Sequence, residues 1–433
     1  MDTELSWEQV KAIADRVVWQ SSGKHLTDRE VAVLHGSWQG RTYESIALEM
    51  NLSADYIHKD VGSALWQKLS VALQEKVGKQ NFKQALQRQK TPLATHGKFP
   101  TGAVAADSPL YVLRPAIESD CERELLNPGA LVRIKSSQMT GKTSLVNWLL
   151  DKMQTHQYQT VRINLRRADR KIFQDIDMLL RWLCANITKQ LGLELVLDDY
   201  WDEAIGSKVS CTGFLQEGIL ESLAADCGGL LLAIDDIDAI FAYPEVAEDF
   251  LSLLREWHEE ANFTESWQRL RLVVAHTTEV YISLDLNQSP FNVGLPVQLP
   301  GFDRTQALYL AELHGWANPQ IDQVLELVGG HPYLTQIALY HLGQQQLDLP
   351  ELLETAPTYN GIYGNHLRHY LANLQAHPDL VAALRAVVTS DQPVALDWSQ
   401  LYRLDGMGLI KLVGNLVEPS CTLYRRYFQV HLA

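Results

Sequence analysis

The chain has 433 residues, 46% hydrophobic and 21% charged, which is an ordinary globular composition with room for about three domains. Its 52 acidic residues outnumber its 37 basic ones, and the net charge of −15 excludes a protein coated uniformly with positive charge. No run of about 18 apolar residues occurs, and the acidic start MDTELSWEQV lacks signal-peptide features. A cytoplasmic protein that does not bind membranes is therefore expected.

Residues 1–88 carry helix signals throughout and are expected to form an N-terminal all-α helix-turn-helix domain. Thr27, followed by Glu30 three residues later, is typical of the capping box that starts a helix. Ser53 can cap a later helix after a tight polar turn. Two short helices joined in this way are the pattern of helix-turn-helix modules.

The segment 26–69, LTDREVAVLHGSWQGRTYESIALEMNLSADYIHKDVGSALWQKL, resembles a LuxR-type helix-turn-helix. The resemblance makes residues 53–68 the recognition helix, whose outward residues are candidate nucleic-acid contacts. Many helix-turn-helix modules bind proteins instead of DNA, so both kinds of partner stay open. The candidate contacts are Tyr56, His58, Lys59, Ser63 and Lys68.

Charge is spread unevenly along the chain. The first 100 residues carry a net charge of +2 and the other 333 carry −17. Residues 59–98 contain eight basic and two acidic side chains, which favours either a local nucleic-acid contact or a solvated helix face. Residues 89–108 are rich in Pro, Gly, Thr and Ala, and this composition predicts a linker.

Between residues 109 and 300 apolar strands alternate with helices. The alternation predicts an α/β core with a parallel five-stranded sheet covered on both faces. Together with the P-loop motif described below, the expected fold is a P-loop NTPase core. The third strand is almost wholly apolar, as expected when both of its faces are buried. The expected strands are 130–135, 158–165, 229–235, 270–276 and 295–299, and the expected helices are 143–156, 172–192, 212–226 and 246–260.

After residue 300 the helical pattern returns. Residues 301–350 are expected to form a helical lid, and residues 351–433 a C-terminal winged-helix domain, because helices precede a short hairpin there. The expected helices are 303–314, 319–329, 332–346, 363–375, 377–389 and 397–406, and the expected hairpin is 408–417.

A segment typical of a P-loop follows the first strand and opens a helix. Gly141, Lys142 and Thr143 match the end of the G-x-x-x-x-G-K-[ST] pattern, but Ser136 stands at the first glycine. In such loops backbone N–H groups surround phosphates, the lysine reaches the β- and γ-phosphates, and the hydroxyl binds Mg²⁺. The expected nucleotide-binding residues in this loop are Gln138, Met139, Thr140, Gly141, Lys142, Thr143 and Ser144.

Acidic residues end the third strand. We predict that Asp235 holds Mg²⁺ together with Thr143, and that Asp236 is the base that activates water. The alternative is a buried strand that reaches water at an acidic turn. The P-loop upstream favours the metal site.

Two further segments have a functional and a structural interpretation. His276, at the end of the fourth strand, is either a catalytic sensor of the γ-phosphate or a hydrogen-bonded strand-end histidine. Gly330 and Pro332 flank a helix boundary, where a cap glycine and a first-turn proline are common. The arginines after the second strand are expected to be salt-bridged or solvated and not an arginine finger. They are Arg166, Arg167 and Arg170.

Residues 111 to about 428 resemble the bacterial AAA-like domain family, P-loop ATPases related to the STAND and origin-recognition-type ATPases. The resemblance implies ATP and Mg²⁺ as cofactors, and it places Gly330 and Pro332 near the adenine. The N-terminal part resembles the helix-turn-helix domain of vWA-MoxR-associated bacterial conflict proteins. The runs that carry the main resemblance are YVLRPAIESDC, IKSSQMTGKTSLV, AIDDIDAIF, LRLVVAHTTEVYISLDLNQSPFNVGLPVQLP, GGHPYLTQIALYHL and GLIKLVGNLVEPSCTLYRRYF.

The resulting hypothesis is an ATP-dependent molecular switch that couples ATP or ADP binding to DNA or to a protein partner. The resemblance suggests bacterial signalling, defence or mobile-element regulation, and ATP-dependent homo-oligomers occur among relatives. Asp236 stands where related ATPases carry glutamate, and the shorter side chain predicts slow hydrolysis. The alternative is a nucleotide-independent helix-turn-helix regulator or adaptor with a degenerate ATPase scaffold.

Overall fold

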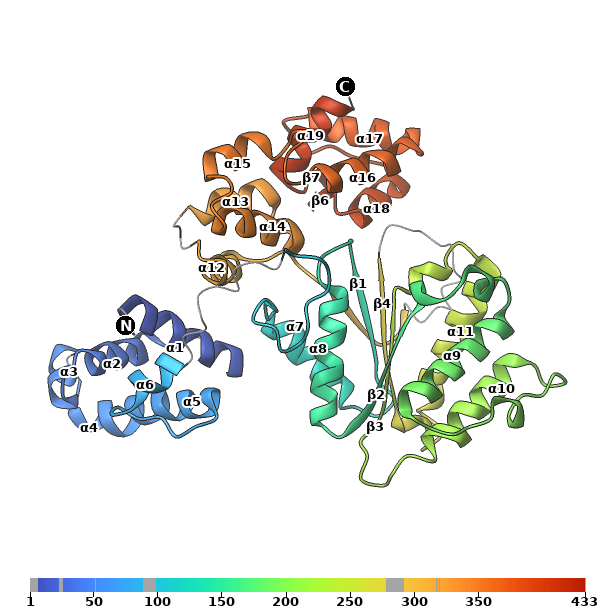
Figure 1. Ribbon diagram of the computed structural model, residues 1–433, viewed down its shortest axis with the longest axis horizontal. Coiled ribbons are helices and arrows are strands. Elements are labelled where there is room, and N and C mark those ends of the chain that lie inside the picture. The colour runs from blue at the N-terminus through green and yellow to red at the C-terminus, as the bar shows by residue number, and fades with distance from the viewer. Residues whose placement is uncertain are drawn as a thin grey trace. The chain divides into compact units, whose positions relative to one another are not determined.

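The chain forms two compact units in a computed structural model that describes residues 7–22, 26–50, 52–88, 99–277, 292–316, 318 and 320–432. One unit comprises residues 1–95 with 113–116, and the other comprises residues 96–112 with 117–433 (Figure 1). No helix within these described ranges is long and apolar enough to cross a membrane.

The first unit is all-α, as predicted. Thr27 accepts a hydrogen bond from the Glu30 N–H, and the Glu30 carboxylate accepts one from the Thr27 N–H, so the capping box is confirmed. Ser53 caps a run made of α4, a π-helical turn at 57–62 and α5, which is the predicted recognition helix. The helices are α1 (Trp7–Ser22), α2 (Asp28–Trp38), α3 (Tyr43–Glu49), α4 (Ala54–Tyr56), α5 (Ser63–Leu73) and α6 (Phe82–Arg88).

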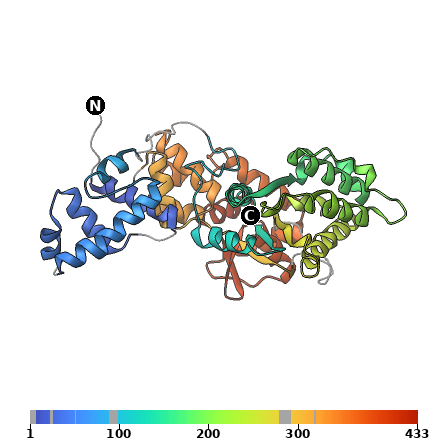
Figure 2. The ribbon, with the colours of Figure 1, turned by 90° about the horizontal axis from the view of Figure 1, so that it is seen from below.

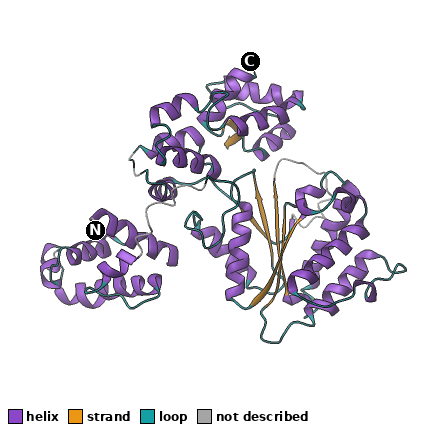
Figure 3. Ribbon diagram, viewed as in Figure 1, coloured by secondary structure: helices purple, strands orange, loops and turns teal. Residues whose placement is uncertain are grey.

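The second unit contains the predicted parallel sheet of five strands, in the order β2-β3-β4-β1-β5 (Figures 1 and 3). Because all strands run in one direction, their carboxyl ends meet at one edge of the sheet. The strands are β1 (Leu131–Ser136), β2 (Tyr158–Asn164), β3 (Gly229–Asp235), β4 (Leu270–Thr277) and β5 (Leu295–Gln298).

Helices cover both faces of this sheet, as the continuous apolar strands require. Apolar side chains of α7 (Pro115–Leu125) and α8 (Lys142–Thr155) pack on one face. Those of α9 (Ile176–Leu191), α10 (Ser207–Gly213) and α11 (Pro244–Glu260) pack on the other. Both ribbon views show α9, α10 and α11 grouped on the same side (Figures 1 and 2). All seven residues of β3 are buried between these layers.

The expected helix 212–226 was wrong at both ends. The helical segment begins at Ser207, after Gly206 with φ +83°, and a π-helical turn ends it at Leu220. The Arg269 guanidinium, far along the chain, donates hydrogen bonds to the carbonyls of Leu220 and Leu223. A tertiary contact thus satisfies the last carbonyl of the helix and one just beyond its end, and no local pattern could have shown this.

The C-terminal region is helical with a small antiparallel hairpin, as predicted. Buried residues of the lid and of the winged helix belong to one hydrophobic cluster, so the two parts share a core. Helix α15 was not expected from the sequence. The elements are α12 (Arg304–Leu313), α13 (Ile321–Val328), α14 (Pro332–Gly343), α15 (Leu349–Thr355), α16 (Gly364–Gln375), α17 (Pro378–Thr389), α18 (Trp398–Gly406), β6 (Ile410–Val413), β7 (Leu416–Pro419) and α19 (Thr422–His431).

Candidate nucleotide site at the carboxyl ends of the strands

The loop between β1 and α8 has the backbone of a P-loop. Gly141 has φ +105°, and Met139 is the one non-glycine residue of the loop with positive φ, at +57°. Ser136 has no positive φ, and its buried hydroxyl donates to the Leu299 carbonyl at 3.4 Å. The first glycine position therefore accommodates serine without left-handed strain, and the substitution leaves the loop intact.

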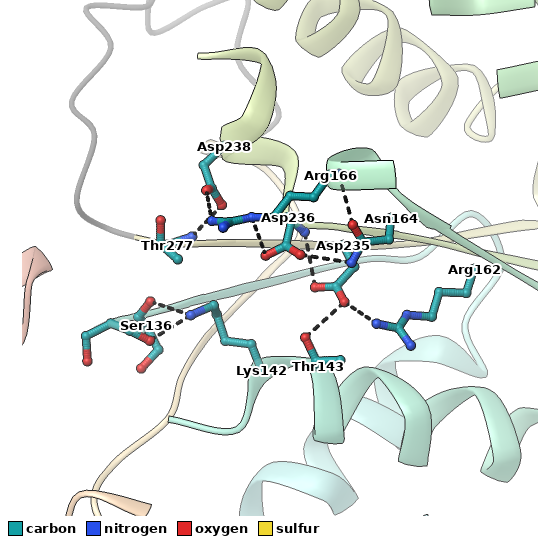
Figure 4. Close-up of polar contacts among 11 residues, drawn as sticks. Ser136, Lys142, Thr143, Arg162, Asn164, Arg166, Asp235, Asp236, Asp238 and Thr277 are labelled. Atoms are coloured by element: carbon teal, nitrogen blue, oxygen red, sulfur yellow. Dashed lines mark hydrogen bonds and ion pairs between the residues drawn. The ribbon is translucent and has the colours of Figure 1, made fainter. Parts of the chain in front are cut away.

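Lys142 is buried and lies inside this loop. Its Nζ donates hydrogen bonds to the carbonyls of Ser136 at 3.0 Å and of Ser137 at 2.7 Å (Figure 4). The loop's own carbonyls thus hold the ammonium group at the N-terminus of the 14-residue helix α8, where the helix dipole favours anions. Lysine, loop and helix end together form a site suited to phosphate.

Thr143 and Asp235 meet in space although 92 residues separate them in the sequence. The Thr143 hydroxyl donates to Asp235 Oδ2 at 3.0 Å (Figure 4). The Asp235 side chain is only 1% exposed, and its Oδ1 accepts the N–H of Asp236 at 3.1 Å. A hydroxyl and a carboxylate are ligands that Mg²⁺ prefers, so these two residues fit the metal that a P-loop employs. Within the described residues no cluster of three or more His, Cys, Asp or Glu side chains offers a protein-only metal cage.

Asp236 occupies a left-handed turn, with φ +55°, directly after β3. Burial raises its pKa, and the neighbouring Asp235 carboxylate raises it further, while hydrogen bonding from Asn164 opposes both effects. Asn164 Nδ2 donates to Asp236 Oδ2 at 2.8 Å, and Arg166 Nε lies 3.4 Å from Asp236 Oδ1 (Figure 4). Side chains from the end of β2 therefore hold the predicted base.

Asp238 extends this network to the fourth strand. Its Oδ2 lies 3.2 Å from Arg166 Nη2, and its Oδ1 accepts the backbone N–H of Thr277 at 2.9 Å. The ends of β2, β3 and β4 are thus tied together by one arginine and two aspartates (Figure 4). Arg166 is salt-bridged, as expected, and Arg167 and Arg170 are exposed.

His276 lies buried at the end of β4, and its ring Nδ1 is 3.0 Å from the Thr277 carbonyl. Burial lowers its pKa to about 4, so the ring is neutral near pH 7 and its Nδ1–H donates this hydrogen bond. The structure therefore shows the hydrogen-bonded strand-end histidine. A role in sensing the γ-phosphate stays a prediction.

The lid contacts the P-loop through His331, a residue that the sequence did not single out. Its Nδ1 accepts the Leu334 N–H at 3.5 Å and so caps α14, while its Nε2 donates to the Gln138 carbonyl at 3.2 Å. Burial lowers the pKa of His331 to about 4, which keeps the ring neutral with this pattern of donor and acceptor. Pro332 begins α14. Gly330 has φ +69°, and a Cβ there would lie 2.4 Å from the Phe302 carbonyl oxygen.

A cavity of about 990 Å³ lies between the P-loop, the lid and the winged helix. Pro332 lines it and Gly330 does not. The residues that line it include Lys135, Ser136, Ser137, Thr140, His276, Gly329, His331, Pro332, Tyr402, Asp405 and Tyr424. The loop thus borders an open space on the lid side.

The five candidate contacts of the N-terminal unit have different surroundings. His58, Lys59 and Ser63 are exposed, as expected. Tyr56 is half-buried, and its hydroxyl accepts a hydrogen bond from Arg29 at 2.8 Å. Lys68 forms an ion pair at 2.8 Å with Glu30, whose side chain is 6% exposed. Tyr56 and Lys68 are therefore engaged within their own domain.

The outward face around these residues is nearly neutral. Lys59 Nζ pairs with Asp55 at 3.2 Å one helical turn away, and Asp60 is also exposed. Proteins that bind DNA usually concentrate positive charge along one helix face, where it contacts the phosphate backbone. The described residues of the predicted recognition helix, 53–68, show no such concentration.

Arg162 and Asn164 are functional candidates that the sequence reasoning missed. Both occupy polar positions in the alternating polar and apolar pattern of β2. Their side chains point towards the acids at the end of β3 (Figure 4). The parallel pairing of Asn164 with Asp235 could have suggested Asn164 once the strand order was known. No signal in the sequence alone sets that order.

Family profiles match almost the whole chain. The profile described as AAA-like domain matches residues 99–430, and the one described as vWA-MoxR associated protein N-terminal HTH matches residues 5–89. An uncharacterized WD repeat-containing protein of Synechocystis is 26% identical over 252 residues, which are 54% of this chain and 20% of that protein. The chain thus spans about a fifth of the length of that curated relative.

Two solved structures resemble about three-quarters of the chain. The Walker-type ATPase PABY2304 of Pyrococcus abyssi superposes with a TM-score of 0.52 at 15% identity, over 76% of this chain and 99% of that one. The ORC2 protein of Aeropyrum pernix, in ADPNP–ADP complexes, gives a TM-score of 0.44 at 13% identity, over 77% of this chain and 97% of that one. The first of these likenesses supports the fold.

Proposed function

The chain belongs to the AAA-like domain family, and on that premise we propose that it is an ATP-binding molecular switch with slow Mg²⁺-dependent hydrolysis. The observation that carries the proposal is the 3.0 Å hydrogen bond between Thr143 and the buried Asp235, beside Lys142 at the N-terminus of α8. Three residue types that phosphate and Mg²⁺ require converge there from two distant segments.

Four side chains and the backbone of the loop have defined tasks in this proposal. The N–H groups of residues 138–143 and the Lys142 ammonium bind the phosphates, and Thr143 and Asp235 hold the metal. Mg²⁺, when bound, neutralises phosphate charge. Asp236 accepts a proton from water, and its raised pKa makes it a stronger base than an exposed aspartate.

Two features support slow hydrolysis. Asp236 is one methylene shorter than glutamate, so its carboxylate reaches less far from the strand. Asn164 and Arg166 also hold that carboxylate at 2.8 Å and 3.4 Å, and both contacts must loosen before Asp236 can turn towards water. A slow cycle suits a switch in which the nucleotide state biases the arrangement of domains.

The lid supplies a route from nucleotide to conformation. His331 donates to the carbonyl of Gln138 in the P-loop, and its helix α14 belongs to the core that lid and winged helix share. Nucleotide that reorganises the P-loop would therefore act on the winged helix through this shared core. The expected adenine contacts, Gly330 and Pro332, adjoin the same histidine in sequence.

The N-terminal helix-turn-helix would recruit the partner of the switch. The near-neutral face around Lys59 and Asp55 favours a protein partner over a DNA backbone. Bacterial signalling, defence or mobile-element regulation is the setting that we propose. The remaining alternative is an adaptor that ignores nucleotide.

Calorimetry with ATP and ADP, with and without Mg²⁺, tests the proposal on wild type and Lys142→Ala. Micromolar binding by wild type that the variant loses supports the switch. Light scattering on the same samples reports any ATP-dependent homo-oligomer. Absence of binding by wild type would leave the adaptor as the function.

A further inference from the structure

Arg162 makes the shortest contact to the predicted metal ligand. Its Nη2 donates to Asp235 Oδ2 at 2.6 Å, on the same oxygen that accepts the Thr143 hydroxyl (Figure 4). The Asp235 side chain is 1% exposed and the Arg162 side chain 27%. A full positive charge thus neutralises the carboxylate away from bulk water, where ionic interactions are strong.

The guanidinium is anchored by the helix that carries Thr143. Arg162 Nη1 donates at 2.9 Å to Asn147 Oδ1, one helical turn beyond Thr143 in α8. Arg162 Nε is buried and has no hydrogen-bond partner among the described residues. The guanidinium is therefore held through its two terminal nitrogens and keeps one buried donor unsatisfied, which costs free energy.

From this geometry we propose that Arg162 is a built-in cation that stands at Asp235 in place of Mg²⁺ and must give way when the metal binds. The proposal rests on the Mg²⁺·ATP site of the proposed function. Mg²⁺ and the guanidinium compete for one carboxylate, because two cations at a single buried acid repel each other. Arg162 is thus a positioning residue that sets how much Mg²⁺ the site needs.

The first test uses no nucleotide and measures thermal unfolding with and without millimolar Mg²⁺ at constant ionic strength. Arg162→Gln leaves the buried Asp235 carboxylate without its cation, so the melting temperature of the variant without Mg²⁺ is expected to fall by about 3–6 °C. Mg²⁺ should restore at least half of that loss, because the metal replaces the missing charge. Wild type should not respond to Mg²⁺, and the double variant Arg162→Gln/Asp235→Asn should lose the response.

Arg255→Gln is the matched control. Arg255 is half-buried to a similar degree, 21%, and its Nε pairs with Glu259 at 2.7 Å on α11, outside the site. Its variant should show no Mg²⁺-dependent recovery. A recovery equal to that of Arg162→Gln would mean that Mg²⁺ acts on the protein generally, and the proposal would fall.

The second test measures the Mg²⁺ concentration that half-saturates ATP binding. Arg162→Gln should lower it about tenfold, and Arg162→Lys, which keeps the charge, should stay near wild type. Asn147→Ala removes the anchor of the guanidinium but keeps its charge, and should lower the half-saturating Mg²⁺ concentration about threefold. This variant provides a second test if Arg162→Gln folds poorly. An unchanged Mg²⁺ requirement in both Arg162→Gln and Asn147→Ala would overturn the proposal.

The two tests separate this inference from the proposed function. Wild type that binds Mg²⁺·ATP while Arg162→Gln behaves like wild type in both tests refutes the role of Arg162 and leaves the switch intact. Wild type that binds no ATP, together with a Mg²⁺-dependent recovery of Arg162→Gln, refutes the switch and retains the built-in cation.

Discussion

Polar residues serve different ends at the proposed nucleotide site and on the outer face of the helix-turn-helix. At the proposed nucleotide site, Lys142, Asp235 and Arg162 come from three separate segments and lie largely out of water. On the predicted recognition helix, residues 53–68, Lys59 pairs with Asp55 one turn away, and both side chains are more than two-thirds exposed. Convergence across segments and burial distinguish the first group from the second.

The energetic difference between the two regions is large. An exposed i,i+4 pair contributes a few tenths of a kcal/mol, so Lys59 and Asp55 reveal little about function. Burying a charge costs several kcal/mol unless partners compensate it, so the cluster around Asp235 needs a chemical reason to exist. The cluster lies at the carboxyl ends of parallel strands, which is the place where open α/β folds bind their ligands.

Lys142→Ala tests most directly whether the buried cluster around Lys142 and Asp235 binds ATP. The variant removes the only side-chain ammonium inside the described P-loop, and ATP affinity should fall about 100-fold or more. Calorimetry measures the change, and circular dichroism confirms that the variant is folded. Retention of wild-type affinity would show that the buried lysine is structural.

Asp236 variants sharpen the assignment of the base. Asp236→Asn should reduce ATP hydrolysis about 100-fold with affinity nearly unchanged, because a general base contributes about that much. Asp236→Glu restores the missing methylene and should raise the rate. Single-turnover phosphate release measures both. Equal rates in wild type and Asp236→Asn would assign the base elsewhere.

The pH dependence of stability tests the contact between lid and P-loop. Burial lowers the pKa of His331 to about 4, below the value of about 6.5 expected in the unfolded chain. Its contribution to stability is therefore complete above pH 6.5 and is lost as the pH falls towards 4. His331→Gln keeps a donor to Gln138 and cannot titrate, so its urea midpoint should drop less between pH 7 and pH 4.5.

His369→Gln serves as the control for that measurement, because His369 is exposed on α16. Desolvation also lowers the pKa values of His276, His314 and His366, so these groups will retain part of the pH dependence in the variant. A drop identical to wild type in His331→Gln would indicate that this ring is not buried in the folded protein.

Lys68 and Lys59 should behave differently although both were candidate nucleic-acid contacts. Lys68→Ala leaves the Glu30 carboxylate buried without its cation and should destabilise the protein by about 1–2 kcal/mol, allowing for the partly exposed lysine. Lys59→Ala should change stability by less than about 0.5 kcal/mol. Urea unfolding measures both, and equal losses would contradict the ion-pair geometry.

Salt-dependent DNA binding is the smallest expected effect. The neutral outward face predicts weak binding at low salt that Lys59→Ala alters by less than about twofold. Fluorescence anisotropy over a range of salt concentrations measures the affinity and its slope. A steep slope of log affinity against log salt concentration, reduced by about one in Lys59→Ala, would show that this helix binds DNA. The two regions would then no longer differ in the way described above.

Periodicity and caps determined most of the fold from sequence. The five strands, their parallel direction and the capping box at Thr27 follow from local alternation and from side chains that bond their own backbone. The P-loop and the acids at the end of β3 were also found, because phosphate and metal chemistry restrict the residue types. The end of the expected helix 212–226 was wrong because Arg269, 49 residues after Leu220, binds the carbonyl at which the helix stops.

The sequence by itself therefore determined which segments form strands, where the P-loop lies and which acids stand beside it, since these depend on neighbours along the chain. The tertiary structure decided what those residues touch. Strand order brings Arg162 and Asn164 of β2 against Asp235 and Asp236 of β3, and the lid brings His331 to the Gln138 carbonyl. Such contacts arise from packing across long sequence separations, where no local pattern records the partner.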